Sequence, residues 1–397
     1  MENGLAAEAA EAATAGEALA HYLHGQATVF LRALGMRSEH EAEADDLLRS
    51  SARRISGALL VYAPLADAAW ADPLRAELAW LSATLSREPQ YTGRLHRLLE
   101  ALHRLSTTGD PAAPDPVTTA DPAQAAPDTE TQSAPRSGAN TPAAAGQSSR
   151  SGATPSEPLS AATAQSSPQT APAALPSPPP GSGPLALGAA RAGALLDRQL
   201  TLARTRAHSA TLQAMGSSRF HALADAIAVL ASEVPLSPAA AGPAATVLPP
   251  LAAQASQRLA DAAAALPLLR AAHPYNAEAV QAALGAELTA DLQDAPWHQV
   301  RVLLRLARYA AEVVPPGQAD SDEGPRYAEA ARLLARHREA AESAAAVATA
   351  ARTPRIAPAT AYALGVLHAD QRHEVEAARF AFSRLWQPAA LPGARRE

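Results

Sequence analysis

Two segments of the chain carry arginines at a spacing that could bind an anion. In the later segment, Arg301 and Arg305 follow His298 by three and seven residues, and Arg308 follows it by ten. At about 100° per residue, these four positions fall within roughly 80° of one another on a helix. Because like charges on one stripe repel each other, acidic neighbours or an anionic ligand should balance them. The pattern therefore favours an anion site.

The earlier segment repeats this spacing around a different anchor. Arg49 and Arg53 follow Asp46 by three and seven residues, and Arg54 comes next. The 33 basic residues of the chain are all arginine. A guanidinium group pairs bidentately with phosphate or carboxylate, which makes arginine suitable for such a site. The absence of lysine excludes P-loop, Schiff-base and kinase chemistry that depends on that residue.

Ion pairs within each helix are an alternative explanation for the same arginines. Arg53 could pair with Asp46, and Arg308 lies four residues before Glu312. Pairs at these spacings stabilise helices without any ligand. Ordinary salt bridges exposed to solvent or between the two bundles could also balance all of these charges. The sequence leaves both explanations open.

Composition narrows the fold class. The 397 residues are 48% hydrophobic but only 4% aromatic, and alanine, the strongest helix former, dominates the apolar set. We expect an all-α protein. The lack of cysteine excludes disulfides and thiolate metal sites, which suits a reducing cytoplasm. The sequence shows neither an apolar run of the roughly 18 to 20 residues that a bilayer requires nor a secretory signal, so we expect a cytoplasmic protein without a membrane segment.

A proline-rich segment interrupts the helical pattern. Residues 107–183 contain 15 of the 34 prolines, no aromatic residue, and six acids against two arginines. Such a composition cannot bury enough apolar surface to offset the entropy of ordering. The predicted organisation is a flexible tail over 1–15, the first part of an N-terminal helical bundle over 16–106, a disordered insertion over 107–183, the remainder of that bundle over 184–235, a C-terminal helical bundle over 236–388, and a tail over 389–397.

Apolar periodicity and helix breakers predict about a dozen helices with short connections. Pro89 and Pro296 are predicted to separate neighbouring helices, and Ser237 is predicted to cap one. The predicted ranges are 16–34, 41–62, 67–87, 91–105, 187–215, 218–232, a helix from 237, 276–292, 296–314, 326–351, 357–367 and 370–386.

The order of these features resembles the CHAD domain, the conserved histidine α-helical domain, which is built from two related helical bundles. The resemblance rests on the anchor His298-x-x-Arg301-x-x-x-Arg305-x-x-Arg308 and on the later run Leu334-Ala-Arg-His337-Arg338-Glu. It implies binding to inorganic polyphosphate, location at polyphosphate granules, and His337 and Arg338 as further candidates. The candidate binding residues are Arg49, Arg53, Arg54, His298, Arg301, Arg305, Arg308, His337 and Arg338.

Several positions depart from the pattern of that family. Asp46 stands where the family has a histidine, Ser56 where it has an arginine, and Pro89-Gln90 where it has an Arg-Asp pair. Val302 and Leu306 replace cationic residues in the later anchor. Two hypotheses therefore remain: a polyphosphate-binding module, or a degenerate CHAD scaffold that acts through protein contacts, with the acidic insertion as its interaction segment.

Other chemistries find little support in the sequence. No serine, histidine and carboxylate set has a recognisable catalytic spacing, so we expect no enzyme and no cofactor. His368 and His373 are five residues apart, which does not place two imidazoles on one helical face, so no metal site is expected. The nearly neutral helical part and the scarcity of aromatic residues argue against nucleic acid. A polyanion such as polyphosphate is the expected partner, alongside a protein partner in the scaffold hypothesis.

Overall fold

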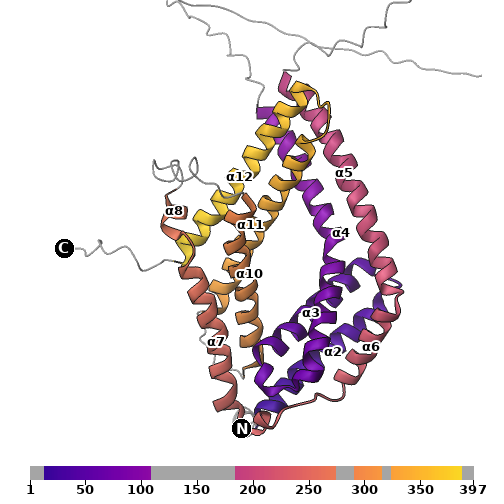
Figure 1. Cartoon of the computed structure of the whole chain (residues 1–397), viewed down its shortest axis with the longest axis vertical. Helices are drawn as coiled ribbons and strands as arrows, with labels where there is room; N and C mark the ends of the chain where they lie inside the picture. Colours follow the sequence, from indigo (N-terminus) through magenta and orange to yellow (C-terminus); the bar gives the residue numbers. More distant parts are fainter. Residues whose placement is uncertain (1–12, 109–183, 274–289, 315–322, 387–397) are drawn as a thin grey trace, which may run out of the picture. The chain divides into compact units, whose positions relative to one another are not determined.

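The computed structural model describes residues 13–108, 184–273, 290–314 and 323–386, and within these ranges it contains ten α-helices and no β-strand (Figure 1). The all-α prediction is confirmed. The helices are α2 (Ala15–Met36), α3 (Glu41–Val61), α4 (Ala68–Thr108), α5 (Pro184–Met215), α6 (Ser218–Leu230), α7 (Ala244–Ala264), α8 (Leu268–Ala272), α10 (Ala290–Val313), α11 (Glu323–Ala351) and α12 (Pro358–Trp386). Two short 3₁₀ turns, Ala63–Leu65 and Pro238–Ala241, lie in the connections.

Local side chains define where two of the helices begin. Thr14 and Glu17 form a capping box at the start of α2: the Glu17 amide donates to the Thr14 hydroxyl at 3.2 Å, and the Thr14 amide donates to the Glu17 carboxylate at 2.7 Å. Ser217 accepts a hydrogen bond from the amide of Phe220 and caps α6. Each cap satisfies backbone donors that have no partner within the first turn.

The first of three main core clusters lies among α2, α3, the first half of α4, α6 and the first half of α7. Phe30, Ile55 and Leu78 are fully buried there. The apolar residues of α3 recur every three or four positions, so one face of that helix is buried and the adjoining face is left for other contacts. We call the helices that share this cluster the N-terminal bundle, although the cluster also includes residues of α7 and α10, which the predicted organisation assigns to the C-terminal bundle.

The other two clusters involve the C-terminal helices. One surrounds Trp297 and Phe382, between the end of α7, α8, α10, the first half of α11 and the end of α12. The other joins the second half of α4 to α5, the end of α11 and the start of α12, around Leu102 and Leu364. Six helices therefore each contribute buried residues to more than one cluster: α4, α5, α7, α10, α11 and α12.

Three predicted helix boundaries are wrong. Helix α4 continues through Pro89, α10 continues through Pro296, and α12 spans the predicted break between 367 and 370 as one helix. A proline removes one amide donor and disfavours the helix locally, but packing along the neighbouring helices outweighs that loss here. Ser237 precedes a 3₁₀ turn and does not cap it; its hydroxyl donates to the carbonyl of Pro64 at 2.7 Å.

Several predictions concern residues outside the described ranges. These are most of the tail over 1–15, nearly all of the insertion over 107–183, the tail over 389–397, and the predicted helix 276–292 except its last three residues. The predicted domain boundaries remain a prediction. Residue Ala15, at the edge of the first tail, is buried and donates its amide to the carbonyl of Gly242 at 2.8 Å. Among the helices of the described ranges, none has the length and apolar character needed to cross a membrane.

Candidate anion-binding site

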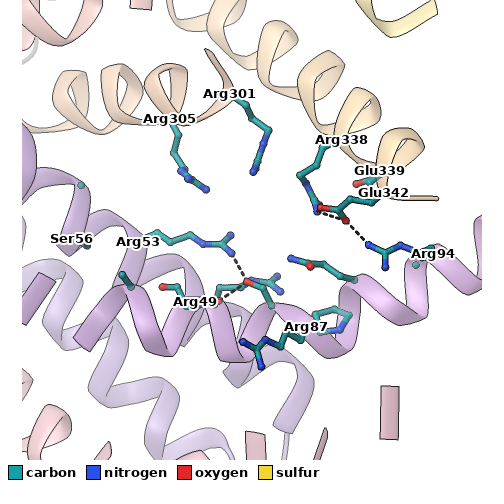
Figure 2. Close-up of a pocket in the computed structure, with 18 of the residues that line it drawn as sticks. Arg49, Arg53, Ser56, Arg87, Arg94, Arg301, Arg305, Arg338, Glu339 and Glu342 are labelled. Atoms are coloured by element: carbon teal, nitrogen blue, oxygen red, sulfur yellow. Dashed lines mark hydrogen bonds and ion pairs between the residues drawn. The ribbon is translucent and has the colours of Figure 1, made fainter. Parts of the chain in front are cut away.

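A cavity of about 750 Å³ lies between α3, α4, α10 and α11, and eight of its 23 lining residues are arginines (Figure 2). We call it the arginine pocket. Only two acids, Glu339 and Glu342, are among its lining residues. Four elements that are distant in sequence thus supply one strongly basic cavity. Its eight arginines are Arg49, Arg53, Arg87, Arg94, Arg97, Arg301, Arg305 and Arg338.

Helix α3 places its arginines beside a buried stripe. Leu48 and Ala52 are fully buried in the N-terminal bundle. Arg49 and Arg53 each follow one of them, and one residue turns the side chain by about 100° around the helix axis. The apolar stripe fixes how α3 sits on the core, and both guanidinium groups consequently reach the pocket.

Helix α10 uses the same arrangement from the opposite wall. Val300 and Leu304 are buried in the cluster around Trp297, and Arg301 and Arg305 follow them directly. In Figure 2, Arg301 and Arg305 extend from α10 toward the side of the pocket from which Arg53 extends. The two predicted arginine stripes therefore face each other across the cavity.

The absence of a side chain at Gly57 permits close contact between α3 and α10. A Cβ atom at this position would lie 2.6 Å from Cδ2 of Tyr309, closer than carbon atoms normally approach. Tyr62, one turn further along, donates its hydroxyl to the carbonyl of Ala310 at 2.8 Å. These contacts fix the separation of the two walls that carry the arginine stripes.

Four of the pocket arginines are already paired with acids. Arg49 binds Asp46 at 2.6 Å, and Arg97 lies 3.5 Å from Glu374. Arg94 and Arg338 share Glu342. Within the described ranges, the other four pocket arginines form no ion pair with a carboxylate; these are Arg53, Arg87, Arg301 and Arg305.

Burial and mutual repulsion destabilise the charged form of two of these arginines. Burial lowers the pKa of Arg53 to about 10, and the charges of Arg305 and Arg49 act in the same direction. Burial lowers the pKa of Arg301 to about 10 as well, with Arg338 and Arg305 contributing. Both remain protonated at neutral pH, and the Nε of Arg301 is buried without a hydrogen-bond partner. An anion in the pocket would relieve this repulsion.

Five of the nine predicted residues line the arginine pocket: Arg49, Arg53, Arg301, Arg305 and Arg338. Arg54 lies outside it, where its Nε donates to Glu312 at 3.0 Å. Arg308 does not line the pocket either. The two pairs named in the alternative explanation do not form, because Asp46 pairs with Arg49, whereas Glu312 pairs with Arg54 and accepts from Tyr22. Arg49 and Arg54 therefore do have ion pairs of the kinds that this explanation allows, within a helix and between bundles.

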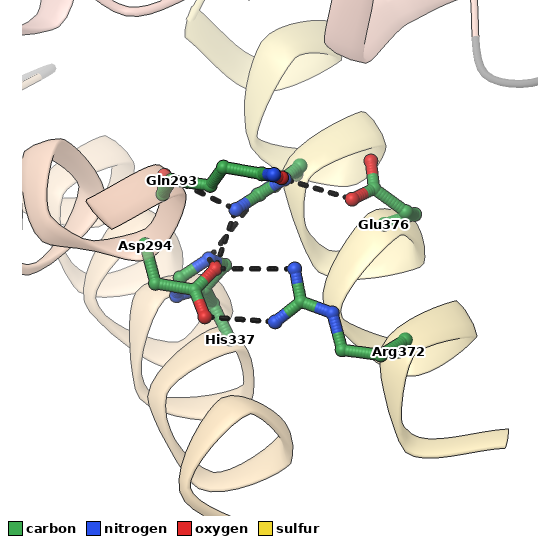
Figure 3. Close-up of polar contacts among 6 residues, drawn as sticks. Gln293, Asp294, His337, Arg372 and Glu376 are labelled. Carbon is green, nitrogen blue, oxygen red and sulfur yellow. Dashed lines mark hydrogen bonds and ion pairs between the residues drawn. The ribbon is translucent and has the colours of Figure 1, made fainter. Parts of the chain in front are cut away.

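The two predicted histidines lie behind the pocket wall. His337 is 1% exposed, stacks on Trp297, and has its Nε2 3.6 Å from Oδ1 of Asp294 (Figure 3). The ring of His298 contacts that of His337 edge to face, with centroids 5.7 Å apart. Burial lowers the pKa of both imidazoles, so both are neutral near pH 7. Neither is among the side chains that line the cavity.

Sequence reasoning missed three arginines on α4. Arg94 and Arg97 follow Arg87 by seven and ten residues, a subset of the spacing of the predicted stripes. No histidine or acid anchor precedes them at the corresponding position, so the pattern was not recognised. The periodic spacing alone would have identified this third wall of the pocket.

Four of the six positions that depart from the CHAD pattern lie at the pocket, whereas Asp46 and Val302 do not line it. Ser56, Pro89, Gln90 and Leu306 all line the arginine pocket. The replaced charges would therefore have pointed into a single cavity. This chain has a less cationic version of that cavity than the family pattern implies.

Comparison with known proteins agrees with this geometry. A protein-family model described as the CHAD domain matches residues 21–336. The chain belongs to the CHAD domain family. A solved structure titled "PptA from Streptomyces chartreusis" is similar to this chain, with 48% sequence identity and a TM-score of 0.66, covering 94% of this chain and 100% of that chain. A search among curated proteins found no match.

Membership of this family places the arginine pocket in a CHAD fold. The matched range includes α2 to α10 and ends within α11, just before His337 and Arg338. Helix α12, which packs on α11, lies beyond it. In the described ranges, no group of three or more histidines and acids is arranged to hold a metal ion.

Proposed function

We propose that this CHAD protein binds inorganic polyphosphate, or a similar polyanion, in the arginine pocket without catalysing a reaction. The observation that carries the proposal is the convergence of eight arginines from four helices on one cavity, four of them without an acidic partner in the described part of the chain. Successive phosphate groups of a polyphosphate chain are all anionic, so several guanidinium groups of the pocket could each bind a different phosphate. Affinity would come largely from counterion release and bidentate hydrogen bonds.

In this proposal the candidate residues have different roles in binding. Arg53, Arg301 and Arg305 would contact phosphate first, because no carboxylate competes for them. Arg49 and Arg338 would contribute less, since each already has an acidic partner. Arg54, His298 and His337 would support the walls from behind, and Arg308 would extend the site beyond the cavity.

A binding role of this kind also suggests a location. A protein whose pocket holds polyphosphate would be recruited to polyphosphate granules in the cytoplasm. The proposal involves neither nucleic acid nor a membrane as partner, and no cofactor.

Binding to labelled long-chain polyphosphate across a salt series tests the proposal. We expect salt-sensitive binding that a combined Arg301→Ala and Arg305→Ala variant loses by roughly a hundredfold or more, because two charge-assisted contacts disappear. The control is Arg191→Ala with Arg198→Ala, which removes two exposed arginines from α5 and makes the same change in net charge. If the control loses as much affinity as the pocket variant, binding follows net charge and not the pocket.

The scaffold hypothesis keeps one observation in its favour. The uncharged residues that replace family cations line the pocket itself, so binding could have been lost while the fold was kept. In that case the protein would act through protein contacts. Absence of polyphosphate binding even at low salt, with the helical fold intact by circular dichroism, would select this second function.

A further inference from the structure

Glu342 occupies an unusual place in the arginine pocket. It belongs to α11, its side chain is 31% exposed, and it bridges two walls of the cavity. Nη1 of Arg338 donates to both of its carboxylate oxygens at 2.9 Å, and Nη2 of Arg94 on α4 donates to Oε2 at 2.6 Å (Figure 2). A carboxylate between two guanidinium groups makes the contacts that a phosphate oxyanion would make.

The pocket therefore has two unlike halves. Around Arg53, Arg301 and Arg305, no carboxylate is bound among the described residues. Around Arg94 and Arg338, Glu342 already supplies the anion, and these two side chains are only 15% and 17% exposed. A polyanion entering the first half meets arginines without a carboxylate partner, of which Arg53 donates to the hydroxyl of Ser86. In the second half it meets donors that already have an acceptor.

We propose that Glu342 is a built-in competitor for phosphate, which keeps Arg94 and Arg338 occupied and so limits the affinity of the pocket and the length of polyanion it holds. This inference rests on the proposed polyphosphate function. When the carboxylate is neutralised, both guanidinium groups become available to the ligand. The second half of the pocket then contributes to binding.

Glu339 provides a matched control. It lines the same pocket from the same helix, but no ion pair joins it to an arginine in the described ranges. Glu339→Gln and Glu342→Gln thus make the same change in net charge and almost the same change in shape. Only Glu342→Gln releases two arginines.

The test compares polyphosphate affinity of the wild type, E342Q and E339Q at several salt concentrations. We expect E342Q to bind long-chain polyphosphate about tenfold more tightly than the wild type, since each charge-assisted contact is worth that much or more. E339Q should show a clearly smaller increase in polyphosphate affinity. E342Q should also show a steeper loss of affinity with salt, because it engages more phosphates.

A double-mutant cycle identifies the arginine responsible. In the wild-type background, Arg338→Gln should change affinity little, because Glu342 already neutralises that charge. In the E342Q background, Arg338→Gln should abolish most of the gain in polyphosphate affinity that E342Q produces. Thermal melting of each variant establishes that the fold is retained.

The outcomes separate the two proposals. If the wild type binds polyphosphate and E342Q binds no more tightly than E339Q, Glu342 is not a competitor, although the proposed function stands. A weaker affinity in E342Q would show that the carboxylate orients its arginines for the ligand, which also overturns the inference. If neither the wild type nor either variant binds polyphosphate, both proposals fall.

Discussion

At the scale of single residues, Asp294 is a buried carboxylate that lies outside the arginine pocket and binds two arginines. Asp294 is 3% exposed and accepts from Nη1 of Arg372 at 2.8 Å and from Nη2 of Arg379 at 2.5 Å (Figure 3). Burial alone would raise its pKa, but the close approach of His337, the hydrogen bonds from Arg372 and the charges of Arg372 and Arg379 lower it to about 2. The carboxylate therefore neutralises two arginines that α12 brings to α10.

Replacing this carboxylate with an amide should destabilise the protein strongly. In Asp294→Asn, Arg372 loses its carboxylate partner and Arg379 keeps only Glu376. Removing one partner of a buried ion pair typically costs about 3–5 kcal/mol. Chemical denaturation measures the change in the free energy of unfolding. Glu376→Gln is the control, because Glu376 binds Arg379 at 2.7 Å from a side chain that is 36% exposed. It should cost less than about 1 kcal/mol, and equal losses in both variants would contradict the central role of Asp294.

Acid titration gives a second prediction at the same residue. Because the folded-state pKa of Asp294 is about 2 and the unfolded value is about 3.9, its stabilisation is present above pH 3.9 and is lost as pH falls through 2. The wild type should lose more stability than Asp294→Asn on acidification across this window. Denaturation midpoints at several acidic pH values measure the difference. Parallel curves for the two proteins would contradict the lowered pKa.

The buried histidines predict a pH dependence nearer neutrality. Burial lowers the pKa of His337, and the neighbouring Asp294 offsets only part of this shift. Burial also lowers the pKa of His298, and the charge of Arg301 lowers it further. Just below neutral pH the unfolded chain therefore binds more protons than the folded protein. The free energy of unfolding should rise with pH up to about 6.5, the pKa of histidine in the unfolded chain, by at most about 1.4 kcal/mol per pH unit for each histidine. His337→Gln should flatten the rise. Stability that falls over this window as pH rises would show that the folded protein holds these histidines charged.

At the scale of helices, the sequence predicts which segments are helical better than where they end. The apolar stripe of α3 and the caps of α2 and α6 follow from local spacing and hydrogen bonding. The breaks predicted at Pro89 and Pro296 do not occur, because a proline acts on one turn while packing acts along the whole helix. Tertiary contacts of this kind cannot be read from a local pattern.

The site was predictable where a helix carries both an apolar stripe and an adjoining arginine stripe. The spacing places Arg49 with Arg53, and Arg301 with Arg305, on one face of their helix, and all four line one cavity. The partner of each arginine was not predictable: Glu342 reaches Arg94, which is 248 residues away in sequence. Such pairs depend on how α4 and α11 cross, which no spacing within either helix encodes.

Pro89 offers a test at this scale, since it lies inside α4 and is exposed at the pocket. Pro89→Ala restores an amide donor in a helix interior and should raise the free energy of unfolding by up to about 3 kcal/mol. Thermal or chemical denaturation measures the gain. Gln90→Ala, which changes the neighbouring side chain but keeps the backbone donors, should change stability by less than about 0.5 kcal/mol. A loss of stability in Pro89→Ala would mean that the wall of the pocket depends on a bend at this proline.

At the scale of the whole molecule, the pocket depends on helices that are shared between cores. Helix α7 contributes Leu248 to the N-terminal bundle and Leu259 to the cluster around Trp297. Helix α4 enters the N-terminal bundle through Leu78 and the third cluster through Leu102. The arginine walls therefore belong to one interlocked helical unit, and loosening any of its cores should also change the pocket.

Residues 109–183, between α4 and α5, should be dispensable for the binding of polyphosphate by this helical unit. Leu102 on α4 lies close to Gly193 on α5, where a Cβ atom would meet it at 3.7 Å, so a short Gly-Ser linker can replace residues 109–183. Because the segment carries six acids against two arginines, its removal should leave polyphosphate affinity unchanged or raise it slightly. The salt series used for the full chain measures this. Affinity lost from a shortened protein that still melts like the full chain would contradict this prediction and show that polyphosphate binding needs the segment as well as the arginine pocket.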